Sequence, residues 1–387
     1  MTAALSVRRV ATPRDFSLIA NRCDELARGM QVRVPFATSK WLASWWHHYQ
    51  ESRPLVRDRF FVHTVHDPQG DLVAIAPLML TERPGNGPLR SRSIAFFGGD
   101  KNITEIRGLT CTSALQGPVV RALLAHFCER GAEWDWFAWN GVLPDSEAYA
   151  ALNEAKHFEW IRETADYVLP LPETWHEFRA GLSRNIKESL RKCYNSLKRD
   201  GHTFTFRVVS EAAELPAALQ VFFDLHARRA DAIDQISHAN LFSSLQARRL
   251  LLDLAACSSD ELRLRVFELE VGGKVVASRL GFVLGDELYL YFSGYDPAWG
   301  KYSVMTTTVS ETIQWAIANK FRLVNLSPGM DVSKTRWGAT AITTHNGLLL
   351  SPMRRGRFVF HVLRELNQLT RPGTFLGKFA DRARRLG

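Results

Sequence analysis

The spacing of hydrophobic and polar residues along the chain predicts a mixed α/β protein. In the N-terminal half, apolar residues recur at helical spacing over residues 38–50. Two strand-like runs then flank the turn sequence DPQGD, residues 67–71. The elements expected in this half are helices at residues 13–29, 38–50 and 113–130 and strands at residues 59–66, 71–81, 93–97 and 134–139.

The C-terminal half repeats this order, which predicts an internal duplication of one α/β unit. The segment GDLVAIAPL, residues 70–78, resembles GKVVASRLG, residues 273–281, and each half then continues as strand, helix, strand. The boundary is expected near the proline-flanked segment LPLPETW, residues 169–175. The elements expected in this half are strands at residues 262–271, 274–284, 287–295 and 321–326 and a helix at residues 303–319.

Two further segments combine helical periodicity with positive charge. Residues 181–201 carry an apolar stripe that includes Ile186 and Leu190, with Ser183 at the expected N-cap. Residues 354–369 form a second amphipathic pattern, rich in arginine. Each fits a helix whose charged side faces solvent. The first equally fits a surface that helps to hold an anionic cofactor or substrate. The second fits a peripheral contact with an anionic membrane or a protein partner.

The charge distribution narrows the range of partners. The chain of 387 residues has a net charge of +9, with a local +7 over residues 353–387 and +5 over residues 179–200, which leaves −3 for the rest. This concentration predicts local contacts with anions and no DNA partner, because a DNA-binding surface is basic over a wider area. The N-terminus lacks a signal-peptide pattern, and the longest apolar run, residues 72–80, is too short to cross a bilayer. We therefore expect a cytoplasmic protein of two domains.

The cysteine and histidine pattern argues against a metal site. The five cysteines are scattered and none forms a CxxC pair, so neither a disulfide framework nor a zinc site is indicated. His47 and His48 are adjacent, and on a helix they would point in different directions. We expect reduced thiols and no bound metal.

The segment from Glu287 to Ala316 carries the clearest candidate chemistry. It reads as an aromatic strand, a short glycine-containing turn and a helix that opens at Ser303. Backbone N–H groups at such a helix start point outward together, and the helix dipole adds partial positive charge there. The segment therefore predicts a site for the phosphate or pyrophosphate of a cofactor.

The same region resembles the CelD-like acetyltransferases, a family of the GNAT superfamily of acyl-CoA N-acyltransferases that is related in fold to the FemAB peptidyltransferases. Residues 302–305 match the family's YSPG-type cofactor turn, and residues 329–338 match its GDEPYKxRWG-type segment. SRNIKESLRK, residues 183–192, resembles its basic helix, and LHARR, residues 225–229, resembles its LHxxR element. The resemblance spans roughly residues 35–350.

The chain departs from the family pattern at the cofactor turn and just after the last expected strand. Val304-Met305 stands where the family favours Pro-Gly, and only glycine lets the backbone approach a ligand without a Cβ in the way. Met330 replaces an acidic residue, and Ser333 replaces a tyrosine. We expect these departures to alter the choice of acyl donor or to weaken catalysis.

The resemblance implies an α/β fold of two tandem GNAT-like units, each a mixed twisted sheet flanked by helices. It implies a non-catalytic domain at residues 1–170, a domain with the acyl-CoA site at residues 171–352, and a basic helix and tail at residues 353–387. In such enzymes the strand before the cofactor turn diverges from its neighbour, and a strand N–H within residues 291–295 would polarise the thioester carbonyl. The residues implied to bind acetyl-CoA or another acyl-CoA are Tyr291, Ser293, Gly300, Lys301, Tyr302, Ser303, Val304 and Met305.

Acyl transfer from a thioester to an amine needs a proton acceptor and a stabilised oxyanion. Asp331 is the first candidate for the base, with a turn-capping aspartate as the alternative. His226 fits a base, a substrate contact or a buried histidine. Tyr295 fits either a proton donor to the thiolate or a packing contact with the cofactor. The candidate substrate contacts are Arg229, Lys334, Arg336 and Trp337.

These patterns predict an N-acyltransferase that moves an acyl group, most simply acetyl, from acyl-CoA to an amine by direct attack. The acceptor is expected to be a small molecule, an amino sugar or a polysaccharide precursor. Two alternatives stay open. One is a FemAB-like transferase that uses aminoacyl-tRNA, held by the basic segments. The other is a non-catalytic scaffold in polysaccharide biosynthesis.

Overall fold

Helices and strands alternate along the chain, as the periodicity predicts. The computed structural model describes residues 5–84, 90–100, 102–232, 239–256 and 262–369. The helices of the N-terminal half are α1 (Pro13–Leu18), α2 (Ala20–Arg28), α3 (Ser39–Tyr49), α4 (Gln116–Glu129) and α5 (Glu147–Asn153). Its strands are β1 (Ser6–Arg9), β2 (Ser52–Arg53), β3 (Val56–Phe60), β4 (His63–His66), β5 (Leu72–Ala76), β6 (Leu78–Arg83), β7 (Ser91–Phe96), β8 (Thr110–Cys111), β9 (Trp136–Val142) and β10 (Phe158–Pro170).

The C-terminal half contains longer elements. Its helices are α6 (Trp175–Gly181), α7 (Arg184–Arg199), α8 (Leu215–Ala230), α9 (Leu245–Ala256), α10 (Val304–Ala318), α11 (Val332–Thr335) and α12 (Arg354–Leu369). Its strands are β11 (Phe204–Val209), β12 (Arg263–Val271), β13 (Lys274–Leu284), β14 (Glu287–Tyr295), β15 (Leu323–Pro328) and β16 (Thr340–Leu350). None of the helices in the described parts of the chain has the length and apolar character needed to cross a membrane.

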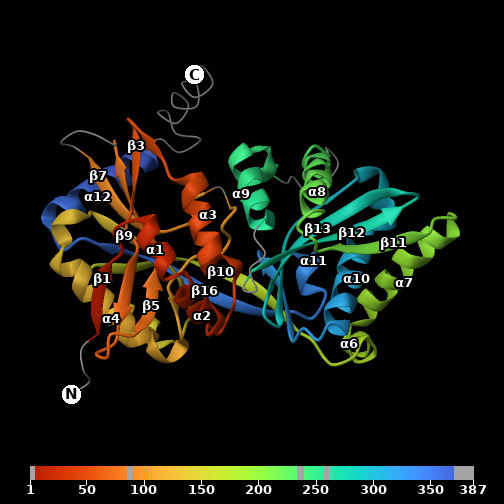
Figure 1. The fold of residues 1–387 in the computed structure, drawn as a ribbon, viewed down its shortest axis with the longest axis horizontal. Coiled ribbons are helices and arrows are strands. Elements are labelled where there is room, and N and C mark those ends of the chain that lie inside the picture. Colours follow the sequence, from red (N-terminus) through yellow and green to blue (C-terminus); the bar gives the residue numbers. More distant parts are fainter. Residues whose placement is uncertain (1–4, 85–89, 101, 233–238, 257–261, 370–387) are drawn as a thin grey trace.

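One large sheet runs through both halves. Its order is β11-β12-β13-β14-β15-β10-β16-β9-β7-β6-β3-β2, and a smaller sheet of order β1-β4-β5-β8 lies in the N-terminal half. Figure 1 shows two lobes with the long strands β10 and β16 running between them. The two halves therefore share a continuous hydrogen-bonded framework, because β10 pairs with both β15 and β16.

The duplicated order of strand, helix and strand is present in both halves. In the N-terminal half, β7 and β9 are parallel, and α4 connects them in sequence. In the C-terminal half, β14 and β15 are parallel, and α10 connects them. Parallel neighbours need such a crossover connection, so the repeated pattern in the sequence corresponds to two equivalent βαβ units.

The structure corrects three of the expected elements. The strand expected at residues 71–81 is divided into β5, which belongs to the small sheet, and β6, which belongs to the large sheet. The helix expected at residues 13–29 is divided into α1 and α2 at Ile19, which is the C-cap of one helix and the N-cap of the next. The strand expected at residues 59–66 is also divided, because β3 pairs with β6 in the large sheet whereas β4 pairs with β1 and β5 in the small sheet. The chain thus changes sheets after Phe60, a step that periodicity does not reveal.

Aromatic side chains bury the contact between the two halves. Trp41 on α3 packs edge-to-face against Phe282 and Tyr291, with ring centroids 5.7 and 6.0 Å apart. Phe36 packs on Tyr289 at 5.5 Å. All five rings belong to one hydrophobic core that draws residues from both halves. A large apolar contact of this kind holds two units in one relative position.

The buried histidine of β4 predicts a pH dependence of stability. Burial, together with nearby positive charges, lowers the pKa of His63 to about 3, while the ring contacts the Phe61 carbonyl at 2.7 Å. The unfolded chain gains a proton at this residue near pH 6.5, whereas the folded protein does not, so acidification favours unfolding. Between pH 7 and pH 5 this residue should reduce the free energy of unfolding by about 2 kcal/mol.

Urea unfolding of wild type and His63→Asn at pH 7 and pH 5 measures this effect. The asparagine amide can still donate to the Phe61 carbonyl but does not titrate. The variant should lose less stability than wild type on acidification. Equal losses in the two proteins would show that His63 does not control the response.

Candidate active site

The site begins where two parallel strands part. β14 and β15 pair at Glu287, Leu288 and Tyr289 and no further, although β14 continues to Tyr295. β15 stays paired with β10 on its other side. Opposite β13, β14 carries a bulge, since the register shifts between the pairs of Ser293 and Leu290. In the described structure, the backbone of β14 beyond Leu290 therefore faces a gap with no strand partner on that side.

The helix after β14 starts beside this gap. Asp296 accepts a hydrogen bond from the Ala298 N–H at 3.0 Å and starts the 3₁₀ turn η5 (Pro297–Tyr302). Ser303 then adopts the left-handed conformation with φ +53°, and α10 begins at the next residue. The first N–H groups of a helix have no partner within the helix, so the start of α10 offers donors to an anion.

A cavity of about 240 Å³ connects the gap with the start of α10. We call it the C-terminal cavity. Many of the residues implied by the family resemblance line it, and they come from α8, β14, α10 and α11. The predicted residues in its lining are Arg229, Ser293, Tyr295, Gly300, Ser303, Val304, Met305, Arg336 and Trp337. The lining residues that sequence reasoning missed are Arg279, Thr306, Val309 and Ser333.

Three guanidinium groups make the C-terminal cavity basic. Arg229 donates to the Ser293 hydroxyl at 2.7 Å, and Arg336 donates to the Ser189 hydroxyl at 2.6 Å. Arg279 has no hydrogen bond or ion pair with any residue that the structure describes, and its Nε is buried. Burial and the neighbouring Arg229 lower the pKa of Arg279 to about 10, which leaves it charged at neutral pH. Glu105 and Asp331 act on its charge only from beyond ion-pair distance, so this cation, which has no direct partner among the described residues, favours an anionic ligand.

Several other predicted residues lie outside the lining. Tyr291 is in the core and donates from its hydroxyl to the Ile103 carbonyl. Tyr302 is buried and donates to Asp200 at 2.9 Å. Lys301 is exposed, with its ammonium 4.7 Å from the Tyr302 ring centroid. Lys301 and Tyr302 thus belong to the turn without lining the cavity, whereas Tyr291 packs against the N-terminal half.

The proposed bases occupy two different environments. His226 is 4% exposed, and its Nδ1 contacts the Ser293 carbonyl at 2.9 Å, so it lies directly against β14. Asp331 is exposed and caps α11, where it accepts from the Ser333 N–H at 2.7 Å. Partial burial opposes ionisation, but the hydrogen bonds from Ser333 and the charge of Lys334 hold the pKa of Asp331 below its usual value.

Two carboxylates of the N-terminal half also stand at the gap. The Tyr289 hydroxyl donates to Glu105 at 2.8 Å, and the Asn325 amide donates to Asp166 at 2.6 Å. Tyr289 and Asn325 form the last pair of β14 and β15, so both carboxylates mark the point where these strands part. No local motif identifies them, because each is separated by more than 150 residues from its partner.

Lys334, one of the predicted substrate contacts, is held by hydrogen bonds to the end of β15. The Lys334 ammonium donates to the Ser327 carbonyl at 3.2 Å and to the Ser327 hydroxyl at 3.1 Å, and also to the Pro328 carbonyl. It thus ties α11 to the end of β15. The described residues contain no group of histidine, cysteine and carboxylate side chains that is placed to hold a metal ion.

Comparisons with known proteins agree with this geometry. Residues 184–335 match the family described as Acetyltransferase (GNAT) domain, a stretch that runs from the start of α7 to the end of α11. This match supports an acyltransferase enzyme and confirms that prediction. Membership in the narrower CelD-like family stays a prediction. The comparison with curated proteins gave no match.

Solved structures show the same fold at low sequence identity. FemX matches with a TM-score of 0.55 and 10% identity, over 88% of this chain and 96% of FemX. L-PGS from Bacillus licheniformis matches with a TM-score of 0.50 and 12% identity, over 92% of this chain and 96% of that one. A tandem GNAT protein from the clavulanic acid biosynthesis pathway matches with a TM-score of 0.44 and 10% identity, over 89% and 97%, which is too distant to carry an argument. The shared fold and the two βαβ units confirm the predicted duplicated α/β architecture, and the GNAT domain match lies in the C-terminal unit.

A close backbone contact beside the site gives a stability prediction. A Cβ at Gly294 would lie 2.4 Å from the His226 backbone nitrogen, so α8 packs on β14 only because this residue is glycine. Gly294→Ala should lower the free energy of unfolding by about 2 kcal/mol or more, through the shift of α8 that it forces. Denaturant unfolding measures this change.

The matched control is Gly181→Ala at the end of α6, where a Cβ would meet nothing within 4 Å. That substitution should change stability by no more than about 0.5 kcal/mol. If the two variants were equally stable, close packing of α8 on β14 would not be what requires glycine at this position.

Proposed function

We propose that the protein transfers an acyl group, most simply acetyl, from acyl-CoA to a primary amine. The C-terminal cavity carries this proposal, because it joins a strand gap to a helix N-terminus within the stretch that matches the GNAT domain. A thioester fits the gap and a pyrophosphate fits the start of α10. The basic lining neutralises the phosphate charge.

The cofactor is held mainly by backbone donors in this proposal. The N–H groups of Val304 and Met305 bind the pyrophosphate, and Arg336 contributes charge from the opposite wall. The thioester carbonyl accepts a hydrogen bond from the unpaired side of β14 within residues 291–295. The same donor stabilises the oxyanion as the carbonyl carbon becomes tetrahedral.

The reaction needs no covalent enzyme intermediate. The amine nitrogen attacks the thioester carbonyl carbon, a C–N bond forms and the C–S bond breaks. The nitrogen loses one proton to a base, and the thiolate leaving group takes up one proton. We propose Tyr295, which lines the cavity, as the donor to the thiolate, and Asp331 as the base. His226 is the second candidate for the base, and it also positions β14 through its contact with the Ser293 carbonyl.

The acceptor is proposed to be a small molecule, an amino sugar or a polysaccharide precursor. The resemblance to CelD-like acetyltransferases supports a role in polysaccharide biosynthesis. Arg229, Arg336 and Trp337 line the C-terminal cavity and are the proposed acceptor contacts there. Lys334 is not among the residues that line the cavity, and it would act on the acceptor through its positive charge.

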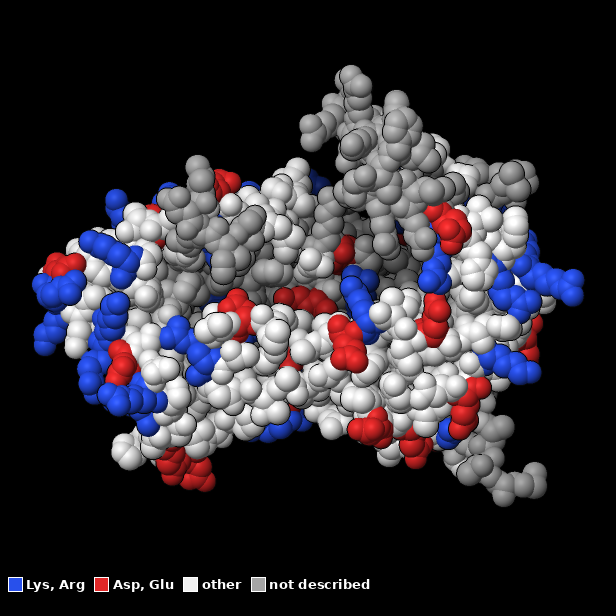
Figure 2. All heavy atoms as spheres, turned by 180° about the vertical axis from the view of Figure 1, so that it is seen from behind, with Lys and Arg blue, Asp and Glu red and all other residues white. Residues whose placement is uncertain are grey.

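A second candidate function rests on the surface of α7. Arg191, Lys192 and Lys198 are exposed on this helix and form no ion pair with any residue that the structure describes. Figure 2 shows lysine and arginine side chains gathered at the end of the molecule that carries α7. Such a face suits the phosphates of a transfer RNA, so an aminoacyl-tRNA is the alternative acyl donor. The fold shared with FemX is compatible with it.

Substitution of Thr306 tests the acyl-CoA proposal. Thr306 lines the C-terminal cavity and lies in the first turn of α10, where the pyrophosphate is proposed to bind. Thr306→Glu should leave the helix intact but repel the pyrophosphate, and so weaken acetyl-CoA binding at least tenfold, as calorimetric titration would measure.

Thr306→Gln is the control, because glutamine has the size of glutamate without its charge. It should bind acetyl-CoA within about threefold of wild type, since only the charge repels the ligand. Micromolar binding by wild type that both variants retain would place the cofactor elsewhere. If wild type bound no acyl-CoA but bound tRNA, with an affinity that falls steeply with added salt, the second candidate would replace the first.

A further inference from the structure

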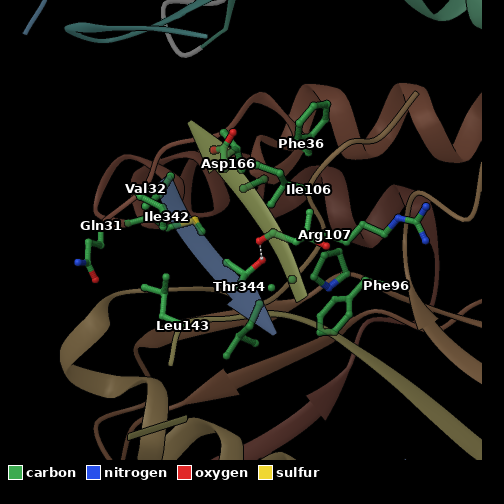
Figure 3. Close-up of a pocket in the computed structure, with 18 of the residues that line it drawn as sticks. Gln31, Val32, Phe36, Phe96, Ile106, Arg107, Leu143, Asp166, Ile342 and Thr344 are labelled. Carbon is green, nitrogen blue, oxygen red and sulfur yellow. Dashed lines mark hydrogen bonds between the residues drawn. The ribbon is translucent and has the colours of Figure 1, made fainter. Parts of the chain in front are cut away.

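A second cavity, of about 90 Å³, lies in the N-terminal half. We call it the N-terminal cavity. Figure 3 shows that it lies against β10 and β16, with side chains of the segment between α2 and α3 on one side. Most of its wall is apolar. The apolar side chains that define it are Val32, Phe36, Phe96, Ile106, Leu143 and Ile342.

The N-terminal cavity occupies the place in its half that the cofactor cavity occupies in the other. It lies where β7 and β9 cease to pair, and Gln116 at the start of α4 lines it. Its chemistry is different, however. Arg107 is the one cation among its described lining residues, whereas the C-terminal cavity has three. An apolar wall of this kind suits a hydrocarbon group and not a pyrophosphate.

One end of the N-terminal cavity is a buried carboxylate. Asp166 lines it and is 4% exposed. Its oxygens accept hydrogen bonds from the Tyr167 N–H at 3.1 Å and from the Asn325 amide at 2.6 Å, and it forms no ion pair with a residue that the structure describes. Although burial raises the pKa of Asp166 to about 6, it is mainly ionised at neutral pH. The charge of Lys334 also acts on Asp166, but from beyond ion-pair distance, so the direct partners of this buried anion are neutral and a cationic group in the cavity can still bind to it.

A second carboxylate stands beside the first. Glu105 lines a small neighbouring cavity of about 70 Å³, which shares Ile106, Thr164 and Thr344 with the N-terminal cavity. Burial raises the pKa of Glu105 to about 8, although the hydrogen bond from Tyr289 and the charge of Lys334 oppose this shift, so Glu105 is mainly protonated at neutral pH. Its carbonyl oxygen can accept a hydrogen bond from an ammonium group that the charge of Asp166 attracts.

The two carboxylates also connect the N-terminal cavity with the gap in the other half. Asp166 binds Asn325 of β15, and Glu105 binds Tyr289 of β14. In the proposed function the acyl carbon lies in this gap. A ligand whose ammonium group is held at Asp166 and Glu105 would therefore present its nitrogen toward the acyl group. The ammonium loses one proton to solvent before attack, and the neutral amine then follows the proton balance of the proposed function.

We propose that the N-terminal cavity is the acceptor site, and that it binds a primary amine with a compact apolar body, whose nitrogen is held at Asp166 and Glu105. This inference rests on the proposed function, narrows its acceptor and replaces the acceptor contacts proposed in the C-terminal cavity, which are left to the acyl donor. The amine enters from the N-terminal half, while the acyl donor enters from the side of α10. The apolar wall selects against an amino sugar, whose hydroxyl groups would find few partners among these side chains.

Calorimetric titration with primary amines, from propylamine to phenethylamine, tests this inference on the full chain. The controls are the alcohols with the same skeletons, and glucosamine. The amines should bind at least tenfold more tightly than their alcohols, because only they carry the charge that Asp166 attracts. Glucosamine should bind no more tightly than the alcohols. Amines and alcohols that bind alike, or no binding by any amine, would overturn the inference.

Three variants locate the site. Val32→Trp fills the N-terminal cavity from a partly buried position and should weaken amine binding at least tenfold. Asp166→Asn should remove the preference for amine over alcohol. Leu55→Trp adds the same side chain at a residue that is 74% exposed and should bind amines as wild type does. Unchanged amine binding by Val32→Trp would exclude the N-terminal cavity.

Acetyl-CoA binding, measured in the same samples, separates this inference from the proposed function and reports on folding. All three variants should bind acetyl-CoA as wild type does, because none of the changed residues lines the C-terminal cavity. If wild type failed to bind acetyl-CoA, the proposed function would fail. If acetyl-CoA bound normally and the amine results were negative, the acceptor site alone would be wrong.

Discussion

The structure depends on the parting of two parallel strands. Beyond Tyr289 and Asn325 the two strands separate, and β15 stays paired with β10, a strand from the N-terminal half, while β14 stays paired with β13. The bulge in β14 helps to turn that strand away. The gap exposes backbone donors of β14, and α10 starts at its edge. The positions of the groups assigned to the proposed chemistry depend on where these two strands separate.

The contact between the halves has a chemical consequence as well as a structural one. Aromatic packing of Trp41 and Phe36 against β13 and β14 fixes the N-terminal half over one face of the sheet. That packing brings Glu105 and Asp166 to the gap, although neither belongs to the stretch that matches the GNAT domain. The N-terminal half therefore contributes polar groups at the active site in addition to stabilising the fold.

Charge is divided between the two sides of the gap. Arg229, Arg279 and Arg336 line the C-terminal cavity, which suits the phosphates of an acyl donor. Asp166 and Glu105 stand on the side of the N-terminal half, which suits a cationic acceptor. An anionic donor and a cationic acceptor would thus be attracted to opposite entrances and would meet where the strands part. This arrangement places the nucleophile near the carbonyl carbon, an effect that accounts for much of the rate in acyl transfer.

The sequence by itself determined the local elements around the cofactor turn. β13 and β14 have the predicted bounds, because glycine turns and alternating apolar residues define them, and the helix start at Ser303 follows from the turn. Strands β10 and β16 were not predicted, since both have many polar and threonine residues and are stabilised by partners distant in sequence. Only the tertiary structure decided that β10 separates β15 from β16, that Tyr291 lies in the core, and that Asp166 reaches Asn325. Such contacts join segments more than 100 residues apart, so no local pattern encodes them.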